Sequence, residues 1–477
     1  MTREELEAIL VSTREELAST KIALESTRAE LAKTLELLKM VLEENQKLRE
    51  QLKRNSKNSS KPPSTDQKGN TGGNNQRPTN IGRIGIARTL FPSERIDRHV
   101  ECSQKNCPHC GSSSIRLSNQ SPEILQQAEL PEAQAFVTEY QLLKYGCIAC
   151  GKNSTARLPK GVPNSAFGPK LMGLLALLTG VYHLAKREAA QLIQDLYGVD
   201  ISVGSVPNIE ERVTAALEPI YKRIHSFVLE SKFCKYFDET GWRDCGQRHF
   251  VWLASCEHAA IYMIHLRRNT EAFEKLVGKS TLDFACVTDR YGVYNSLKIH
   301  QYCLAHLIRE FRLYAERDGP DKEIGEALER ELKTVCRIHR NYREEQLSFK
   351  QRNRQLKGSQ RKVECWLEDG MANGSDELSK ICESLLDNFD KLWTFIRVSG
   401  MDPTNNLAER DLRKLVLWRK KSYGTRSNRG KNFVEKITSV AQTLKRRGKN
   451  VLHFIQEAVA SFYRGSAVPF ISEALGF

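Results

Sequence analysis

The stretch Lys232-Phe-Cys-Lys-Tyr-Phe-Asp238-Glu-Thr-Gly-Trp242 decides the expected fold of this chain. Its run from Phe233 to Phe237 is rich in aromatic residues and predicts a β-strand that ends at Asp238. A second strand, a third strand, a helix and a fourth strand are expected next, at residues 249–255, 259–266, 270–277 and 282–288. The fourth strand should end at Asp289.

Three strands, a helix and a fourth strand form the opening order of an RNase H-like α/β fold. In that order the ends of the first and fourth strands lie side by side. Asp238 and Asp289 should therefore meet at one edge of the sheet. Two carboxylates brought together repel each other, and hard divalent cations with oxygen ligands relieve that repulsion.

A third carboxylate follows much later, in Asp402-Pro-Thr-Asn-Asn-Leu-Ala-Glu409-Arg410. Pro403 and Thr404 mark a helix start, and Glu409 falls in the first turns of that helix. Asp238, Asp289 and Glu409 then predict a site for two Mg²⁺ (or Mn²⁺) ions about 3.5–4 Å apart, which would act on a phosphodiester. An Asp after a strand is more often a cap, and a Glu beside an Arg is more often a solvated ion pair. The ordered set of three favours the catalytic interpretation.

A basic tract surrounds the third carboxylate. Residues 404–450 hold 14 Lys or Arg against 3 Asp or Glu. Such a density favours a track for DNA phosphates over a merely solvated face, and it predicts affinity without sequence choice. The candidate DNA-binding residues are Arg410, Arg413, Lys414, Arg419, Lys420, Lys421, Arg426, Arg429 and Lys431.

The expected catalytic domain spans residues 231–465, with an α-helical insertion at about 316–400 and a C-terminal tail at 466–477. Trp366 and Trp393 should anchor the packing of the insertion. Two further helices, at residues 433–447 and 451–463, should close the domain.

Residues 161–230 should be helical and could bind DNA. The segment Arg187 to Tyr197 ends at Gly198, a typical helix stop, and a second helix is expected from Ser205 to Leu217. Helix, glycine-containing turn and helix resemble a helix-turn-helix, although such pairs are also common packing units.

Residues 93–160 should form a zinc-binding domain. They contain Cys107-Pro-His-Cys110-Gly and Cys147-Ile-Ala-Cys150-Gly, with a strand-like stretch from Gln134 to Lys144 between them. Cys107, Cys110, Cys147 and Cys150 suit a tetrahedral structural Zn²⁺, because four protein ligands leave no open position for chemistry. Cys102 and His109 are alternative ligands.

Residues 1–54 should form one long coiled-coil helix. Leu10, Leu17, Leu24, Leu31 and Leu38 recur at every seventh position, and Thr13, Thr20, Thr27 and Thr34 form a second seam. This heptad pattern favours a homodimer or higher homo-oligomer over packing on the chain itself. Residues 55–92 are rich in Asn, Ser, Gly, Pro and Lys and should form a flexible basic linker.

Composition agrees with a polyanionic partner and a reducing compartment. The 477 residues carry a net charge of +15, which favours nucleic acid. The 13 cysteines are an odd number, and four of them lie in Cys-x-x-Cys pairs. The longest apolar run, Leu171 to Val181, is shorter than the roughly 20 residues needed to span a bilayer. We therefore expect a cytoplasmic protein with no membrane partner.

The ordered motifs resemble transposases of the insertion sequence 66 family. The matching features are the N-terminal heptads running into Asn58-Ser-Ser-Lys-Pro-Pro-Ser64, the two cysteine knuckles, Asp238-Glu-Thr240, Asp289-Arg-Tyr-Gly-Val-Tyr-Asn295 and Asn405-Asn-Leu-Ala-Glu-Arg410. The resemblance implies a DDE-type, Mg²⁺-dependent transposase with Asp238, Asp289 and Glu409 as its acidic triad. It also implies binding to the terminal inverted repeats of a mobile element and association with a bacterial nucleoid, and it leaves open whether accessory proteins take part.

The segment His300-Gln-Tyr-Cys303-Leu-Ala-His306 resembles the Cys/His stretch that follows the second Asp in such enzymes. For Cys303 and His306 we favour a structural or substrate-positioning role over a metal site. Arg290 stands where a smaller or polar residue is expected, and the tract from Trp418 to Gly424 is diverged. The alternative to an active transposase is a non-catalytic or domesticated DNA-binding protein on the same scaffold, and a related nuclease or resolvase is a third option.

Overall fold

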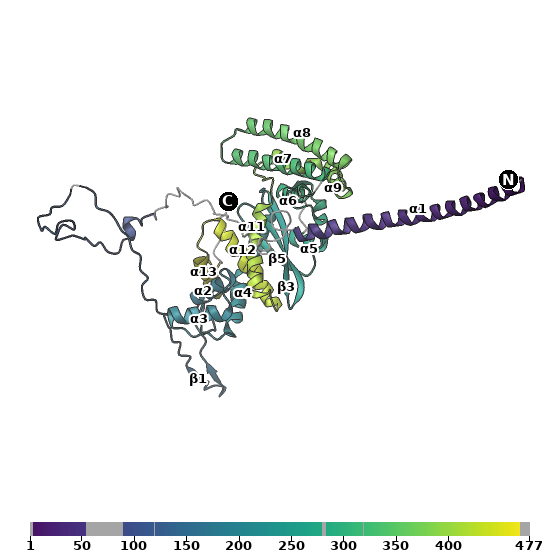
Figure 1. Ribbon diagram of the computed structural model, residues 1–477. Coiled ribbons are helices and arrows are strands. Elements are labelled where there is room, and N and C mark those ends of the chain that lie inside the picture. Colours follow the sequence, from purple (N-terminus) through teal and green to yellow (C-terminus); the bar gives the residue numbers. More distant parts are fainter. Residues whose placement is uncertain (1–2, 54–88, 119, 279–282, 318, 468–477) are drawn as a thin grey trace.

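The computed structural model describes residues 3–53, 89–118, 120–278, 283–317 and 319–467 (Figure 1). Most of the expected linker and tail lie outside these residues. The long helix α1 (Arg3–Lys53) projects from a compact body of helices around one sheet. The segment that holds the two cysteine pairs, residues 93–160, extends from the other side of that body and is called the cysteine segment below. No helix among the described residues is long and apolar enough to cross a membrane.

A five-stranded mixed sheet lies at the centre of the body. Its strands are β3 (Lys235–Asp244), β4 (Gln247–Ser255), β5 (Ala260–His265), β6 (Ala285–Thr288) and β7 (Ile299–Tyr302). Their spatial order is β5-β4-β3-β6-β7. The first three strands are antiparallel, whereas β6 and β7 run parallel to β3. The expected alternation of three strands, one helix (α5, Thr270–Val277) and a fourth strand is confirmed.

The first strand corrects our prediction, because it does not end at Asp238 but continues to Asp244. The extension pairs with β4 up to Asp244 opposite Gln247. Between them Cys245 and Gly246 both have positive φ, 51° and 78°, as a two-residue type I′ hairpin turn requires. Cysteine is not a usual residue in such a turn, so the sequence did not reveal this hairpin.

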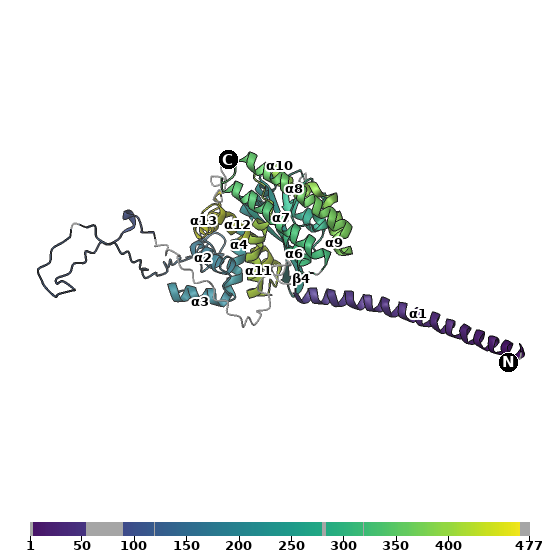
Figure 2. The ribbon, with the colours of Figure 1, turned by 45° about the horizontal axis from the view of Figure 1, so that its top comes forward.

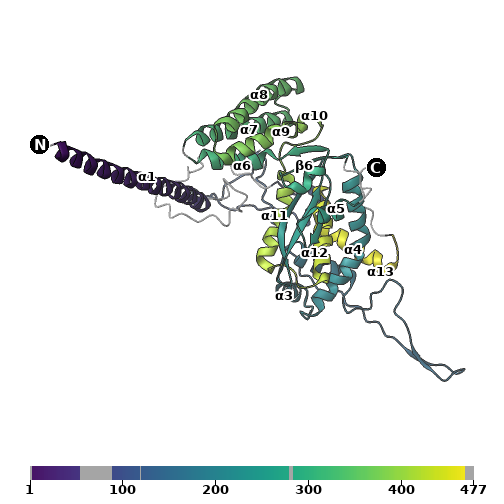
Figure 3. The same ribbon diagram turned by 90° about the vertical axis from the view of Figure 1, so that its right-hand side faces the viewer.

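The segment that precedes the sheet forms the helices α2 (Pro169–Gly180), α3 (Lys186–Tyr197) and α4 (Ser205–Glu230). Helix α4 packs against β5, α2 packs on α4, and α3 packs on α2. Gly198 ends α3 in the left-handed conformation with φ 65°, as expected for a helix stop. The second helix of the pair is longer than expected and shares one hydrophobic core with the sheet. Figure 3 shows the sheet between α11 on one side and α4 with α13 on the other.

Helix α12 (Asn428–Arg446) covers the edge of the sheet that β5 forms. Its side chains of Thr443, Ser439 and Glu435 accept hydrogen bonds from the backbone N–H groups of β5, at 3.2, 3.0 and 2.6 Å. An uncovered edge strand is a template for aggregation, and these contacts satisfy its free donors. Helix α13 (Val451–Arg464) then packs on α2, which completes the body.

Residues after β7 are mostly helical, as expected for residues 316–400. After α6 (Leu304–Ala315), the chain continues through α7 (Pro320–Arg343), α8 (Phe349–Asn373), α9 (Asp376–Asp387), the short turn η4 (Phe389–Leu392) and α10 (Thr394–Arg397). These helices stack beside one end of the sheet (Figures 1 and 3), and the view of Figure 2 brings them forward over it. Trp393 is buried at 3% exposure, and Trp366 is half-buried against the same core, in agreement with their expected anchoring role.

The cysteine segment contains little regular structure. A short turn at Ser93–Arg95 and a hairpin of β1 (Lys144–Gly146) with β2 (Asn153–Thr155) are its elements. The strand expected from Gln134 to Lys144 is wrong, since only Lys144 belongs to one. Side chains such as Phe136 and Val137 are 95% and 83% exposed. Without a partner strand or a core to cover them, their apolar character does not produce a strand.

Candidate active site

The sheet places Asp238 and Asp289 next to each other. In the parallel pair β3–β6, Lys235 lies opposite Cys286 and Tyr236 opposite Val287. Carrying this register two residues further puts Asp238 opposite Asp289, just after β6 ends. Residues in register on neighbouring strands share one face of the sheet and are about 5 Å apart. The expected meeting of the two aspartates is therefore supported by the strand pairing itself.

Charge repulsion is strong at Asp238. Burial raises the pKa of its carboxyl well above the ordinary value, and the negative charges of Glu239, Asp289 and Glu409 raise it further. One hydrogen bond, from the backbone N–H of Glu239 at 2.9 Å, partly offsets this. The charges of both Asp289 and Glu409 thus act on Asp238, so the three carboxylates that the sequence singled out are close enough to interact electrostatically.

A short network of hydrogen bonds brings Glu409 to this edge. The Asn405 side chain donates to the Phe237 carbonyl at 2.8 Å, directly before Asp238. The Asn405 backbone N–H donates to the Cys303 sulfur at 3.1 Å, and the Cys303 N–H donates to the Thr288 carbonyl at 2.8 Å, directly before Asp289. Helix α11 (Asn406–Ser422) begins after this network, and Glu409 lies in its first turn.

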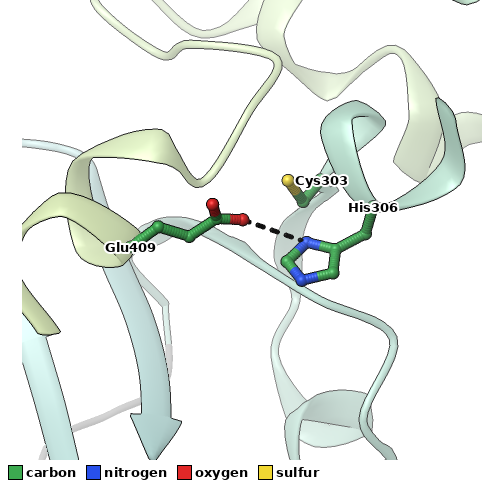
Figure 4. Close-up of side chains that lie close together, drawn as sticks. All are labelled: Cys303, His306 and Glu409. Carbon is green, nitrogen blue, oxygen red and sulfur yellow. Dashed lines mark ion pairs between the residues drawn. The ribbon is translucent and has the colours of Figure 1, made fainter. Parts of the chain in front are cut away.

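Glu409 contacts residues of α6 and not the two aspartates. Its Oε1 accepts a hydrogen bond from the Arg309 guanidinium at 2.6 Å. The same oxygen lies 3.6 Å from Nδ1 of His306. Among the described residues, Asp238, Asp289 and Glu409 do not form a group whose ligand atoms all lie within 4.8 Å of one another, whereas Cys303, His306 and Glu409 do (Figure 4).

Glu239 is a fourth acidic residue that sequence reasoning did not single out as a site residue. Its side chain is only 1% exposed and is paired with Arg268, whose Nε donates at 2.8 Å. The Tyr294 hydroxyl also donates to it. Burial and the charge of Asp289 raise the pKa of this carboxyl, and Tyr294 and Arg268 lower it. Because the Arg268 guanidinium already neutralises it, the Glu239 carboxylate is less suited to hold a metal ion than Asp238.

The donor set fits a hard divalent cation. Asp238 is a half-buried carboxyl with three negative neighbours, and within the described residues no Lys or Arg forms an ion pair with it or with Asp289. Asp238 and Asp289 would hold Mg²⁺, and Glu409 would complete the set by turning from Arg309. Oxygen ligands of this kind suit Mg²⁺ or Mn²⁺.

The nine basic residues proposed for DNA binding divide into two sets. Lys414, Arg419 and Lys431 are engaged inside the protein, where they bond to Gln442, the Gly241 carbonyl and Asp244 respectively. Arg429 pairs with Glu211 at 3.3 Å on the surface. The exposed members are Arg410, Arg413, Lys420, Lys421, Arg426 and Arg429. The first set stabilises the fold, so the second set is the surface that can meet phosphates.

Both cysteine pairs form knuckle turns of the same shape. In the first, the Cys107 N–H donates to Ser112 and the Gly111 N–H donates to Cys107, and the second repeats this pattern from Cys147 to Lys152. The backbone N–H groups of His109 and Cys110 lower the pKa of the Cys107 thiol. In the second knuckle the N–H groups of Cys150 and Ala149 act in the same way on the pKa of Cys147. Each knuckle therefore favours a thiolate, as zinc binding requires, although among the described residues the four sulfurs are not gathered within 4.8 Å.

The fold and the acidic residues together define a class: a mixed helix-and-sheet protein with buried and half-buried carboxylates clustered where β3 and β6 lie side by side. Comparison with known families identifies which one. The model described as "Transposase IS66 family" matches residues 164–432, more than half of the chain. The chain therefore belongs to this family of transposases, and the resemblance drawn from its motifs is confirmed.

Two other matches cover the N-terminal part. The model described as "zinc-finger binding domain of transposase IS66" matches residues 104–151, which contain all four knuckle cysteines and support a structural zinc ion. A family of unknown function matches residues 12–89. A protein of Sinorhizobium fredii described as "Uncharacterized protein y4jD" is 22% identical over an alignment of 424 residues that covers 81% of this chain and 81% of that protein.

Proposed function

We propose that this chain is a DNA transposase that cleaves and joins DNA at the terminal inverted repeats of a mobile element. Asp238, Asp289 and Glu409 act as its metal-binding catalytic triad. One observation supports the proposal: hydrogen bonds of Asn405 and Cys303 link the start of α11 to Phe237, directly before Asp238, and to Thr288, directly before Asp289.

The strand order β5-β4-β3-β6-β7 supports an RNase H-like catalytic domain. In that fold the first and fourth strands carry the first two acidic residues, as β3 and β6 do here. When bound, a pair of divalent ions would supply an activated water or 3′-hydroxyl on one side of the phosphodiester and charge stabilisation on the other. Asp238 and Asp289 would hold these ions from the sheet, and Glu409 would hold them from α11.

Around the triad, other residues of the chain would hold the DNA. The exposed cations of α11 and the turn after it, Arg413, Lys421 and Arg426, would contact backbone phosphates without reading sequence. Cys107, Cys110, Cys147 and Cys150 would hold a structural zinc ion. The α1 helix would pair with a second copy, since transposition requires two DNA ends to be held together.

The test compares the wild-type protein with Glu409→Gln on DNA carrying candidate element ends, in Mg²⁺. Removing one carboxylate ligand should abolish strand cleavage and joining and leave DNA binding within a factor of about 2–3. A matched control, Glu457→Gln, changes an exposed glutamate on α13 and should retain full activity. Equal cleavage by Glu409→Gln and wild type would remove Glu409 from the site.

A second candidate function follows from the pairing of Glu409 with Arg309. If that ion pair persists with DNA bound, the chain is a non-catalytic DNA-binding protein on the same scaffold. In the experiment above, this alternative predicts tight binding to element ends and no cleavage by the wild-type protein in either Mg²⁺ or Mn²⁺.

A further inference from the structure

Cys303, His306 and Glu409 form a side-chain cluster beside the proposed Mg²⁺ site. Their ligand atoms all lie within 4.8 Å of one another. Figure 4 shows the Glu409 carboxylate and the His306 ring facing each other, with the Cys303 sulfur beside them. Cys303 and His306 come from the junction of β7 with α6, and Glu409 comes from α11, so two distant segments build the cluster.

The sulfur of Cys303 is held in place by backbone contacts. It is 2% exposed and accepts the Asn405 N–H at 3.1 Å. His306 is three residues further on, in the first turn of α6, so its ring lies on the same side of the helix. A thiol and an imidazole three residues apart at a helix start are a common arrangement of metal ligands.

The His306 ring has a nitrogen with no hydrogen-bond partner. Its Nδ1 is buried and unsatisfied among the described residues, although it lies 3.6 Å from Oε1 of Glu409. A buried nitrogen without a partner is costly. Because it faces a carboxylate across a gap longer than a hydrogen bond, a cation between them would satisfy both groups.

The chemistry of the three donors differs from that of the aspartate pair. Mg²⁺ prefers oxygen ligands, whereas thiolate and imidazole select Zn²⁺ and similar borderline ions. Burial raises the pKa of the Cys303 thiol to about 12, but a coordinated zinc ion deprotonates a thiol outright. The partly exposed side chains of His306 and Glu409, at 25% and 32%, leave a path for an ion to enter.

We propose that Cys303, His306 and Glu409 bind one zinc-class divalent ion, and that this ion holds Glu409 on the α6 side, away from Asp238 and Asp289. The binding site stands on the cluster alone. Its consequence, inhibition of the Mg²⁺-dependent reaction, rests on the function proposed above. Arg309 occupies Oε1 of Glu409 at 2.6 Å, so it must yield that oxygen or share the carboxylate when the ion binds.

The first experiment counts zinc bound to the full chain after equilibrium dialysis against buffered Zn²⁺. Cys303→Ser and His306→Gln should each retain about one ion fewer per chain than wild type, because one missing ligand weakens a site by more than the roughly 10–100-fold lost with an outer-shell partner. Cys365→Ser on α8 and His453→Gln on α13 are exposed controls and should bind as wild type does. Wild-type stoichiometry in both cluster variants overturns the proposal.

A second experiment does not depend on variants that alter the buried cluster. The four knuckle cysteines touch no part of the core, since Cys110, Cys147 and Cys150 are exposed and Cys107 is half-exposed. A chain with all four changed to serine should still bind Co²⁺ and give a thiolate-to-cobalt charge-transfer band. That band should disappear when Cys303→Ser is added. A knuckle-free chain that binds Co²⁺ without any such band contradicts the proposal.

The consequence for activity is measured separately. Added Zn²⁺ should inhibit strand cleavage in Mg²⁺ by wild type, and the zinc concentration for half inhibition should rise at least about tenfold in Cys303→Ser. If the chain has no cleavage activity at all, the proposed function fails while the zinc count and the cobalt band still decide whether the cluster binds metal. If cleavage occurs but zinc inhibits both proteins equally, the blocking role of this ion is wrong.

Discussion

At the residue scale, Asp238 shows a conflict between stability and function. Its carboxyl is half-buried next to Glu239, Asp289 and Glu409, and burial together with these charges raises its pKa well above 3.8. A folded state that raises the pKa of an acid binds its proton more tightly than the unfolded state does. The ionised form therefore destabilises the metal-free protein, and the divalent ion proposed above would offset that cost.

The first prediction follows from this sign. Below about pH 3.8 Asp238 is protonated in both states and costs nothing, and the cost grows as pH rises toward its folded-state pKa. Asp238→Asn should therefore raise the stability of the metal-free protein at neutral pH, because the amide carries no charge that burial and the neighbouring carboxylates would oppose. Thermal midpoints of both proteins across pH would measure it. The gain should vanish in acid and shrink in Mg²⁺, whereas Asp200→Asn, in an exposed loop, should change little at any pH.

The second prediction concerns Asn405, which joins α11 to β3. Asn405→Ala leaves the Phe237 carbonyl without its donor, and a buried unpaired group costs about 1–3 kcal/mol. Urea denaturation should show this loss, and cleavage should fall because Glu409 is no longer positioned. The neighbouring Asn406 is exposed, so Asn406→Ala should stay within about 0.5 kcal/mol of wild type. Equal stability of the two variants would show that this hydrogen bond does not hold the helix.

At the element scale, the sequence predicted the strands and helices whose pattern is local. The order of β3 to β6 and the bounds of α5 follow from apolar runs and turn residues, and Gly198 ends α3 as expected. The extent of β3 could not be predicted, because its outer half depends on pairing with β4 across a Cys245-Gly246 turn. The absence of pairing explains the strand that was predicted and does not form. The stretch from Gln134 to Lys144 has no partner strand among the described residues and forms no strand before Lys144.

The basic residues near α11 show a similar limit. Their density in sequence predicted a charged surface, but it could not separate the exposed cations from those that stabilise the fold. Lys431 pairs with Asp244 at 3.0 Å, and Arg419 reaches back to the Gly241 carbonyl of β3. Which cations are engaged depends on how β3 lies against α11 and the start of α12, and these contacts join residues more than 170 positions apart.

A third prediction tests the exposed set. Changing Arg413, Lys421 and Arg426 to glutamine should flatten the dependence of DNA affinity on salt, by about 0.9 in logarithmic slope for each phosphate that the protein no longer neutralises. Binding titrations at several salt concentrations measure the slope. A control triple of exposed lysines elsewhere, Lys170, Lys232 and Lys380, should leave it unchanged. A slope that changes equally in both triples would indicate a diffuse effect of net charge instead of a DNA track.

At the scale of the whole molecule, the central body could be anticipated better than the segments that extend from it. The body has one continuous core. The cysteine knuckles and α1, by contrast, have few neighbours within the chain, and their final state depends on what they bind. Each knuckle folds through its own backbone hydrogen bonds, whereas gathering four sulfurs requires the metal, because zinc binding and folding are coupled in such modules.

The α1 helix carries an apolar stripe that nothing in the described part of the chain covers. Leu10, Leu17, Leu24, Leu31 and Leu38 are 52–71% exposed along it, and a helix in water with such a stripe needs to cover it. The threonines of the second seam are suited to burial, because Thr13, Thr20, Thr27 and Thr34 already donate to carbonyls of their own helix, at 2.8 to 2.9 Å. Burying them in an interface would leave no hydroxyl without a partner.

The fourth prediction is therefore that α1 assembles the protein through its leucine seam. The double variant Leu17→Glu, Leu31→Glu places charges in that seam and should convert a dimer or higher oligomer into a monomer, as measured by sedimentation. Ile22→Glu is the matched control, since Ile22 is exposed at 70% but lies outside both seams. Joining of two paired DNA ends should fall in the seam variant while single-end binding is kept. A wild-type chain that sediments as a monomer would leave the exposed leucines without an explanation and would contradict the pairing of two DNA ends through this helix.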